Sequence, residues 1–172
     1  MAGFDYSSKS SRAEEGAPAQ LNSVMYLPEM DHVGIIVKDA DKAAMDMETR
    51  FGAKIINRET IEFPKVIYKG NRLSYSAYFV FVDMGNTKIG FIQPDFNVPS
   101  PYLDILNEKG EYAHHFCFLV KSTQEYIEKF RVDNPGMRII AEAQAQSAKG
   151  GDMVYIEGVI PGILIELATL IE

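Results

Sequence analysis

The sequence predicts an α+β fold made of two tandem βαβββ modules, each a strand followed by a helix and three further strands. The first observation behind this prediction is an internal repeat, because the same order of hydrophobic patterns occurs over about residues 31–95 and again over about 112–170. The second is that Asp31-His32 and His114-His115 open the two copies in register. Two copies of one unit usually pack about a pseudo-twofold axis, so equivalent positions should converge on a shared cavity.

The first module begins with a β-branched run, HVGIIV at residues 32–37, which is typical of a buried strand. Asp39 is the expected N-cap of a helix whose apolar residues recur at helical spacing as far as Phe51, and Gly52 is its expected C-cap. The stretch 63–76 contains KGNR and is predicted to be a turn or mobile loop. The remaining strands of this module are expected over about 53–61, 77–84 and 87–93.

A short amphipathic helix over about 100–109 is expected to link the modules. The second module opens with a buried strand at 115–120, and its helix begins at a capping box formed by Ser122 and Glu125. The sequence NPG at 134–136 ends this helix. Three more strands are expected over about 137–145, 153–160 and 163–170.

Length and composition fit one globular domain, here residues 30–172, since the chain has 172 residues of which 47% are hydrophobic. Residues 1–29 are rich in Ser, Ala, Glu and Gly and are predicted to be a flexible extension. They contain no apolar secretion signal, and no window of the chain is apolar enough to span a membrane, so we expect a soluble, cytoplasmic protein.

The net charge of −7, with Lys and Arg scattered among carboxylates, argues against a nucleic-acid partner. The single cysteine, Cys117, lies in the apolar run FCFLV and is predicted to be structural. The expected partner is therefore a small molecule.

Alternation along the strands places His32 and Gly34 on one face, and His115 and Cys117 on the equivalent face of the second module. The small residue two positions after each histidine, Gly34 or Cys117, leaves room for a bound ligand. Glu166 lies among apolar residues in the last strand, where a buried carboxylate must be paired, protonated or bound to a cation. A glutamate at a sheet edge or in a salt bridge would also explain it. Two registered imidazoles and one carboxylate are, however, the donor set of a divalent-metal site with open positions.

From about residue 31 to 170 the chain resembles the vicinal oxygen chelate superfamily, which includes glyoxalase I, methylmalonyl-CoA epimerases, fosfomycin-resistance enzymes and extradiol dioxygenases. Its epimerase-like branch is the most similar. The segments that carry the resemblance are DHVGIIV (31–37), GNTK (85–88), SP (100–101), HHF (114–116) and GILIEL (162–167). The resemblance implies that the two modules form a cupped, barrel-like mixed sheet around a metal, and it implies a homodimer.

The resemblance also implies the site residues. The metal ligands of the superfamily fall on His32, His115 and Glu166, while a fourth ligand of glyoxalases and epimerases falls on Gly90. Gln93 would replace it only if a bulge shifted the strand. An acid that epimerases carry on the preceding strand corresponds to Tyr78, so Glu166 and Tyr78 are the catalytic candidates.

Three functions follow from this set. The first is a metal-dependent epimerase, isomerase or lyase, in which a Zn, Ni, Co, Mn or Fe(II) ion polarises a small carbonyl or acyl-thioester substrate and a base moves a proton through an enolate. Glu166 is the first candidate for this base, with Tyr78, Tyr155 and Glu157 as weaker ones. The second is a non-haem Fe(II) extradiol-type dioxygenase, because two histidines and one carboxylate are its ligand set. The third is a binding protein for small molecules without turnover.

Three cations in the predicted loop 63–76, Lys65, Lys69 and Arg72, could cap an anionic substrate. Glu157-Gly158-Val159 stands where epimerases of the branch have Pro-Lys, which argues mildly against methylmalonyl-CoA as the substrate.

Overall fold

The structure is a computed structural model that describes residues 26–146 and 151–169. Most of the extension predicted for residues 1–29 therefore lies outside the described residues. The described chain forms eight strands and three helices, in the order β1 (Met30–Ile36), α1 (Ala40–Phe51), β2 (Lys54–Tyr68), β3 (Asn71–Asp83), β4 (Lys88–Pro94), α2 (Pro101–Lys109), β5 (Tyr112–Leu119), α3 (Thr123–Asp133), β6 (Arg138–Gln146), β7 (Asp152–Ile160) and β8 (Ile163–Ala168).

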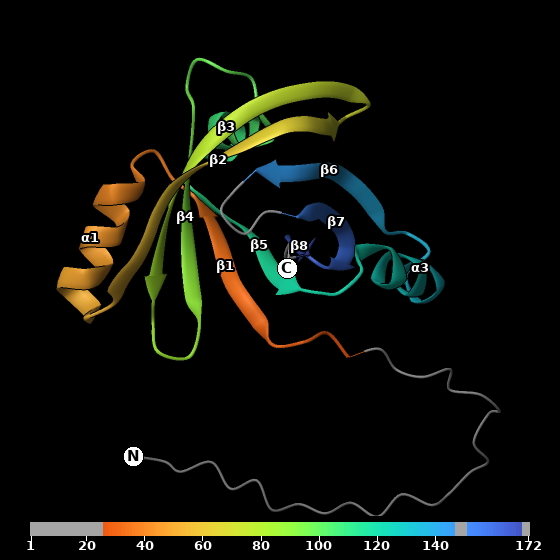
Figure 1. Ribbon diagram of the computed structural model, residues 1–172, viewed down its shortest axis with the longest axis horizontal. Coiled ribbons are helices and arrows are strands. Elements are labelled where there is room, and N and C mark those ends of the chain that lie inside the picture. The colour runs from red at the N-terminus through yellow and green to blue at the C-terminus, as the bar shows by residue number, and fades with distance from the viewer. Residues whose placement is uncertain (1–25, 147–150, 170–172) are drawn as a thin grey trace, which may run out of the picture.

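The eight strands close into one mixed barrel in the order β1-β4-β3-β2-β6-β7-β8-β5. Module 1 (β1 to β4 with α1) and module 2 (β5 to β8 with α3) have the same internal order, and the first and last strands of each module pair in parallel. The modules meet at two antiparallel seams, β1 with β5 and β2 with β6. The predicted α+β fold of two βαβββ modules is thus confirmed, with α1 and α3 on opposite outer sides of the barrel (Figure 1).

The helix boundaries follow the capping residues. Asp39 accepts a hydrogen bond from the backbone N–H of Lys42, and Gly52 ends α1 with a φ of 69°. Ser122 likewise accepts from the backbone N–H of Glu125 at the start of α3. The link between the modules is helical as predicted, and Ser100 caps it.

The prediction of a loop over residues 63–76 is wrong, because this stretch is the far half of a long hairpin between β2 and β3. Phe63, Val66 and Tyr75 are buried there and supply the apolar contacts that hold the strands against the rest of the barrel. Only Lys69 and Gly70 turn the chain, both with positive φ, as a two-residue type I′ hairpin turn requires. The KGNR signal therefore marks a tight turn in place of a mobile loop.

The apolar residues form three clusters. Two of them lie between the barrel and the outer helices, one under α1 with Val80, Val82 and Ala44, and one under α3 with Ile127 and Ile165. The third fills the barrel interior and includes Tyr102 of α2, which is fully buried. The link helix thus closes part of the interior and limits the space left at the centre. No helix among the described residues is long and apolar enough to cross a membrane.

Candidate metal centre

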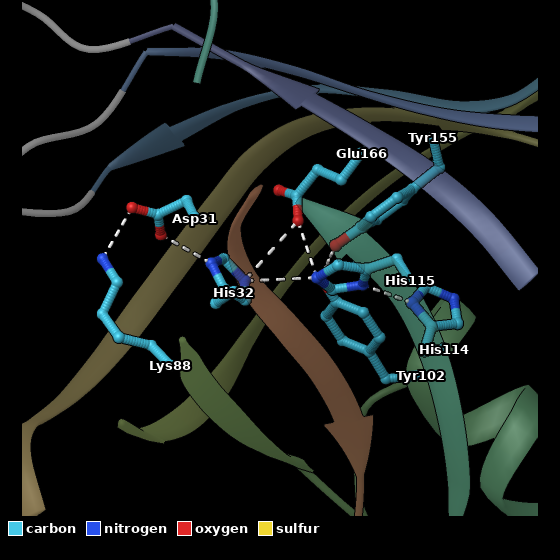
Figure 2. A network of polar contacts seen from close by, with 8 residues as sticks. All are labelled: Asp31, His32, Lys88, Tyr102, His114, His115, Tyr155 and Glu166. Carbon is cyan, nitrogen blue, oxygen red and sulfur yellow. Dashed lines mark hydrogen bonds and ion pairs between the residues drawn. The ribbon is translucent and has the colours of Figure 1, made fainter. Parts of the chain in front are cut away.

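The structure brings His32, His115 and Glu166 together inside the barrel, from β1, β5 and β8 (Figure 2). The strand pairing explains how, since Gly34 of β1 lies opposite His115, and Cys117 of β5 lies beside Glu166. Nε2 of His115 lies 2.7 Å from Oε2 of Glu166 and 3.3 Å from Nε2 of His32, and the latter lies 3.9 Å from the same carboxylate oxygen. All three side chains are buried, with exposed fractions of 8% for His32, 0% for His115 and 6% for Glu166.

The small size of Gly34 suggests room for a ligand, but the structure fills this space with a side chain. A Cβ atom at this position would lie 2.1 Å from Cε1 of His115, so the imidazole ring occupies the space over the glycine. The small residue of β1 therefore allows the histidine of the other module to approach, and the space is not left for a ligand.

Each of the two histidines of the site forms a hydrogen bond, through its Nδ1 atom, with the residue that precedes it in the chain. Consecutive strand residues normally point to opposite faces, but Asp31 and His114 both lie where the β1–β5 pairing shifts register, at β-bulges. A bulge re-aims a side chain, and here both extra residues turn toward the histidine that follows them. Oδ2 of Asp31 lies 2.9 Å from Nδ1 of His32, and Nδ1 of His114 lies 2.8 Å from Nδ1 of His115.

Asp31 determines which ring nitrogen of His32 carries the proton. Burial raises the pKa of the Asp31 carboxyl, but the hydrogen bonds with His32 and Lys88 and its electrostatic interactions with both residues lower it to about 2. Nζ of Lys88 lies 2.6 Å from Oδ1 of Asp31 and neutralises it. An ionised Asp31 accepts the Nδ1–H of His32, which leaves the lone pair of Nε2 directed into the site (Figure 2).

His114 lets His115 carry its proton on either nitrogen. Burial lowers the pKa of His114 far below its usual value, so this imidazole is neutral and its Nδ1 can either donate or accept. If His114 donates, Nε2 of His115 holds a proton and gives it to Glu166 as a hydrogen bond. If His115 donates, its Nε2 lone pair is free to bind a cation.

The protonation states of the site favour a cation. Burial raises the pKa of Glu166, but attraction and hydrogen bonding by His115 outweigh it and the pKa is lowered. Burial also lowers the pKa of His115, and the nearby Glu166 offsets this only in part. These directions favour an ionised Glu166 beside a neutral His115, and the deprotonated forms are those that bind metals.

The spacing of the three donor atoms fits a divalent ion. Bonds of about 2.1 Å place neighbouring ligand atoms roughly 3.0 to 3.4 Å apart in octahedral or tetrahedral geometry. The separations of 2.7, 3.3 and 3.9 Å bracket this interval. Imidazole with carboxylate suits Zn, Ni, Co, Mn and Fe(II). A second group, Asp31, His32 and Cys117, fits less well, because Lys88 binds Asp31 and burial raises the pKa of the Cys117 thiol.

A cavity of about 150 Å³ opens beside His32 and Glu166. Its walls are aromatic, with Phe63, Phe79 and Phe81 from module 1 and Tyr155 from module 2, and Tyr102 of α2 lies there too. The hydroxyl groups of Tyr102 and Tyr155 lie 2.7 Å apart, and burial raises the pKa of both well above 10, so both are protonated donors. Glu59 of β2 is a second carboxylate in the lining, contributed by module 1.

Other predicted residues lie away from the cavity. The hydroxyl of Tyr78 lies 3.1 Å from Oδ2 of Asp41, and its ring packs with the cluster under α1, so Tyr78 faces outward and its predicted catalytic role does not fit. Phe79 and Phe81 take the inner face of β3 instead, because side chains alternate along a strand. Gln93 also faces α1, where its Oε1 accepts from the backbone N–H of Ala40.

The loop cations and Glu157 also lie elsewhere. Lys65, Lys69 and Arg72 do not line the described part of this cavity, and Lys69 pairs with Asp104. Glu157 forms an ion pair with Arg138 on the surface.

Several residues of the site were not predicted as such, among them Glu59, Phe79, Phe81 and Tyr102. The alternation of YSAYFVFV does separate Phe79 and Phe81 from Tyr78, but it does not tell which face is inner. Tyr102 had no such signal, since a tyrosine in a short amphipathic helix is compatible with either the surface or the core.

Residues 31–155 match the protein family described as Glyoxalase/Bleomycin resistance protein/Dioxygenase superfamily. The chain belongs to this superfamily. The match spans β1 to the middle of β7, so Glu166 lies beyond it. The predicted resemblance to the vicinal oxygen chelate superfamily is confirmed.

Individual members of the superfamily are similar to the chain at low identity. An uncharacterised protein of Bacillus subtilis, YqjC, is 27% identical over 80% of the chain and 89% of its own length. The mitochondrial methylmalonyl-CoA epimerase of Homo sapiens is 26% identical over 84% of the chain and 76% of its own length. The crystal structure of methylmalonyl-CoA epimerase from Mycobacterium tuberculosis superimposes with a TM-score of 0.62 at 19% identity, covering 88% of the chain and 94% of that structure.

Proposed function

We propose that the protein is a divalent-metal-dependent epimerase or isomerase that moves a proton next to a carbonyl group of a small carbonyl or acyl-thioester substrate. The observation that carries the proposal is the convergence of two imidazole nitrogens and one carboxylate oxygen, all buried, beside a small aromatic cavity that His32 and Glu166 line. The similarity to methylmalonyl-CoA epimerases supports the same class of reaction.

His32, His115 and Glu166 would hold the metal ion. When bound, a divalent ion polarises a carbonyl group and thereby makes the adjacent C–H more acidic. The chain's own residues keep the donors in place, because Asp31 orients His32 and His114 orients His115. The aromatic wall excludes water from the substrate, which strengthens electrostatic interactions inside the cavity.

An epimerase needs acid and base groups on both sides of the reacting carbon. Glu166 from module 2 is one candidate, and Glu59 is the carboxylate that module 1 contributes to the described cavity lining. Oε1 of Glu59 lies 2.7 Å from Nδ2 of Asn57, which orients it. One of the hydroxyls of Tyr102 and Tyr155 donates to the other, and the hydroxyl that accepts can donate its own proton to an oxygen that becomes negatively charged.

The test combines metal analysis with proton exchange. Purified protein should contain about one divalent ion per chain, and His32→Ala and His115→Ala should each lose it, while His114→Asn should retain most of it. In D2O without oxygen, the metal-loaded protein should exchange the α-hydrogen of methylmalonyl-CoA or of a simpler 2-methyl-1,3-dicarbonyl compound. A protein without metal, or a loaded protein that exchanges no α-hydrogen of any such compound, would contradict the proposal.

A second candidate function is an Fe(II)-dependent dioxygenase. The observation that favours it is Gly90, which leaves three protein ligands at the centre, the set used by non-haem Fe(II) oxygenases. Oxygen uptake by Fe(II)-loaded protein with a catechol would support this candidate, and turnover with Co or Zn in the absence of oxygen would exclude it. Binding of these compounds with neither reaction would point to a binding protein. The homodimer stays a prediction that sedimentation velocity can check.

A further inference from the structure

The cavity beside the candidate metal centre, here called the central cavity, has an open end and a closed end. At the open end Glu59 and Leu119 are half-buried and border the solvent. At the closed end Phe63 and Tyr102 are fully buried. The central cavity therefore has a mouth, through which a ligand can enter, and a floor that consists of aromatic rings.

Tyr102 lies at the centre of this floor. The centroid of its ring lies 6.2 Å from those of Phe63 and Phe79 and 6.4 Å from that of Tyr155, in edge-to-face arrangements. The hydroxyl groups of Tyr102 and Tyr155 lie 2.7 Å apart (Figure 2). The ring cannot move aside without the loss of these contacts, so the floor is fixed in place.

A second cavity, of about 330 Å³, lies behind the floor. It is lined by Ile105 of α2, by His114 of β5 and by Leu164 of β8, among others. It lies toward the first residues of β5 and β8, whereas the central cavity lies toward their last residues. The ring of His114 packs edge-on against that of Tyr102 at 5.6 Å. Tyr102 on one side and His114 on the other therefore separate the two cavities.

The floor residue Tyr102 comes from the link between the modules. It is the second residue of α2, whereas Phe63 and Tyr155 belong to the strands β2 and β7. The first turn of α2 is fixed by Ser100, whose buried Oγ accepts a hydrogen bond from the backbone N–H of Leu103 at 3.1 Å. The depth of the central cavity is thus set by a helix that belongs to neither module.

We propose that Tyr102 is a specificity-determining residue: as the floor of the central cavity, it limits the group carried by the reacting carbon of the substrate to about the size of a benzene ring. A cavity of about 150 Å³ has the volume of a site that holds a molecule of that size. The rest of a larger substrate stays outside the mouth, beyond Glu59 and Leu119. This inference rests on the proposed function and extends it by naming the size of the part that enters.

The first experiment measures size selection in the metal-free protein, so that the result does not depend on turnover. Benzene, toluene, ethylbenzene and n-butylbenzene are titrated into the protein in EDTA. The NMR signal of the methyl group of Met153, which lines the central cavity, reports binding. Each buried methylene group normally strengthens apolar binding by about fourfold. In the wild type we expect this gain to end at toluene, because the floor stops a longer chain.

The second experiment removes the floor in two steps. Tyr102→Ala removes the whole ring, and Tyr102→Val leaves a smaller side chain. We expect n-butylbenzene to bind Tyr102→Ala at least about tenfold more tightly than it binds the wild type, with Tyr102→Val between the two. The matched control is Tyr75→Ala. The ring of Tyr75 stacks on Phe63 at 4.9 Å but does not line the described part of the central cavity, so this variant should keep the size limit of the wild type.

The exchange of α-hydrogen tests the same limit in the metal-loaded protein. The wild type should exchange a 2-methyl-1,3-dicarbonyl compound at least about tenfold faster than its 2-butyl analogue, and Tyr102→Ala should reduce this ratio to less than about threefold. An unchanged ratio in Tyr102→Ala would contradict the role of Tyr102.

The outcomes separate this inference from the proposed function. If the Met153 signal shows the size limit and its shift in the Tyr102 variants but no compound is exchanged, the size limit of the cavity stands and the proposed function fails. If the affinity of the wild type keeps rising to n-butylbenzene, if none of the four probes binds, or if Tyr75→Ala changes the limit as Tyr102→Ala does, the role of Tyr102 is wrong. The wild-type titration decides the size limit even where a variant does not fold.

Discussion

Module 1 and module 2 contribute the same strands to the barrel but unequal chemistry to its centre. Each supplies a histidine from its first strand, with an aromatic ring of its third strand near that histidine, Phe81 at 5.3 Å from His32 and Tyr155 at 5.0 Å from His115. The last strands differ, since β8 carries Glu166 where β4 carries Gly90. The parallel pairing with the first strand of the module has the same register at both positions, so the side chains there can differ while the pairing is kept.

The supports behind the two histidines differ in the same way. Asp31 is ionised and paired with Lys88, whereas His114 is neutral and buried at an exposed fraction of 2%. Module 1 therefore holds its histidine with charge, and module 2 holds its histidine with an uncharged donor or acceptor. The two modules thus preserve the position of the histidine more strictly than the interaction that orients it.

The largest effect should come from the one carboxylate that only module 2 supplies. Glu166→Gln keeps the shape of the side chain and removes its charge, so the affinity for Co2+ or Zn2+ should fall by more than about 100-fold. Isothermal titration calorimetry measures it, and Glu157→Gln, a surface change, is the control. An unchanged affinity would mean that the two modules contribute equally and that Glu166 is not a ligand.

The two glycines of module 1 that pair with each other, Gly34 and Gly90, should respond unequally to a methyl group. Gly34→Ala places Cβ 2.1 Å from His115, whose ring is fixed by Glu166 and His114, and should lower the free energy of unfolding by about 2 to 3 kcal/mol. Gly90→Ala meets Phe81 at 2.8 Å and should cost about 1 kcal/mol, since this ring borders a cavity and can shift. Urea unfolding measures both. Gly136→Ala, which meets no described atom within 4 Å, is the control, and equal costs at positions 34 and 90 would refute the distinction.

Asp31, which is charged, and His114, which is neutral, should contribute unequally to the metal affinity. Asp31→Asn should weaken metal affinity by about 10- to 100-fold, because it removes a charged hydrogen-bond acceptor from His32. His114→Asn keeps a polar group beside His115 and should weaken affinity by less than about tenfold. Competition with a chromophoric chelator can rank the two variants, and the reverse order would show that charge is not what module 1 contributes.

Asp31 should also give the metal-free protein a dependence on pH. Its pKa is lowered in the folded state from 3.8 to about 2, so the stabilisation is complete at neutral pH and is lost as the pH falls through this range. The free energy of unfolding in EDTA should fall by about 2 kcal/mol more for the wild type than for Asp31→Asn between about pH 6 and pH 2. Parallel curves for the two proteins would contradict the ion pair.

The smallest effect should come from the tyrosine of module 1 that faces outward. Tyr78→Phe removes a hydroxyl that contacts only Asp41 among the described hydrogen bonds, so metal affinity should change less than about twofold. Tyr155→Phe, inside the cavity, should leave metal content intact and slow α-hydrogen exchange by about tenfold or more. Equal rates for the two variants would remove Tyr155 from the proposed chemistry.

The secondary structure could be predicted well where the signals are local. Helix α1 is marked by Asp39 and Gly52, and helix α3 by Ser122, and each cap lies where the sequence places it. The hairpin of β2 and β3 was not predicted, because its far half owes its structure to pairing with β6 of the other module, about 75 residues later in the chain. Pairing over such a distance leaves no periodic trace in either strand alone.

The sequence by itself determined the two modules, the equivalence of His32 and His115, and the unusual position of Glu166 in an apolar strand, because alternation and repetition are properties of the chain. Only the tertiary structure decided that Asp31 and His114 turn toward the site at bulges, that Tyr78 faces α1, that Tyr102 enters the barrel and that Phe81 covers Gly90. The reason is that a strand pattern distinguishes two faces but does not say which is inner. Closure of the barrel makes that choice through contacts between residues that are far apart in the chain.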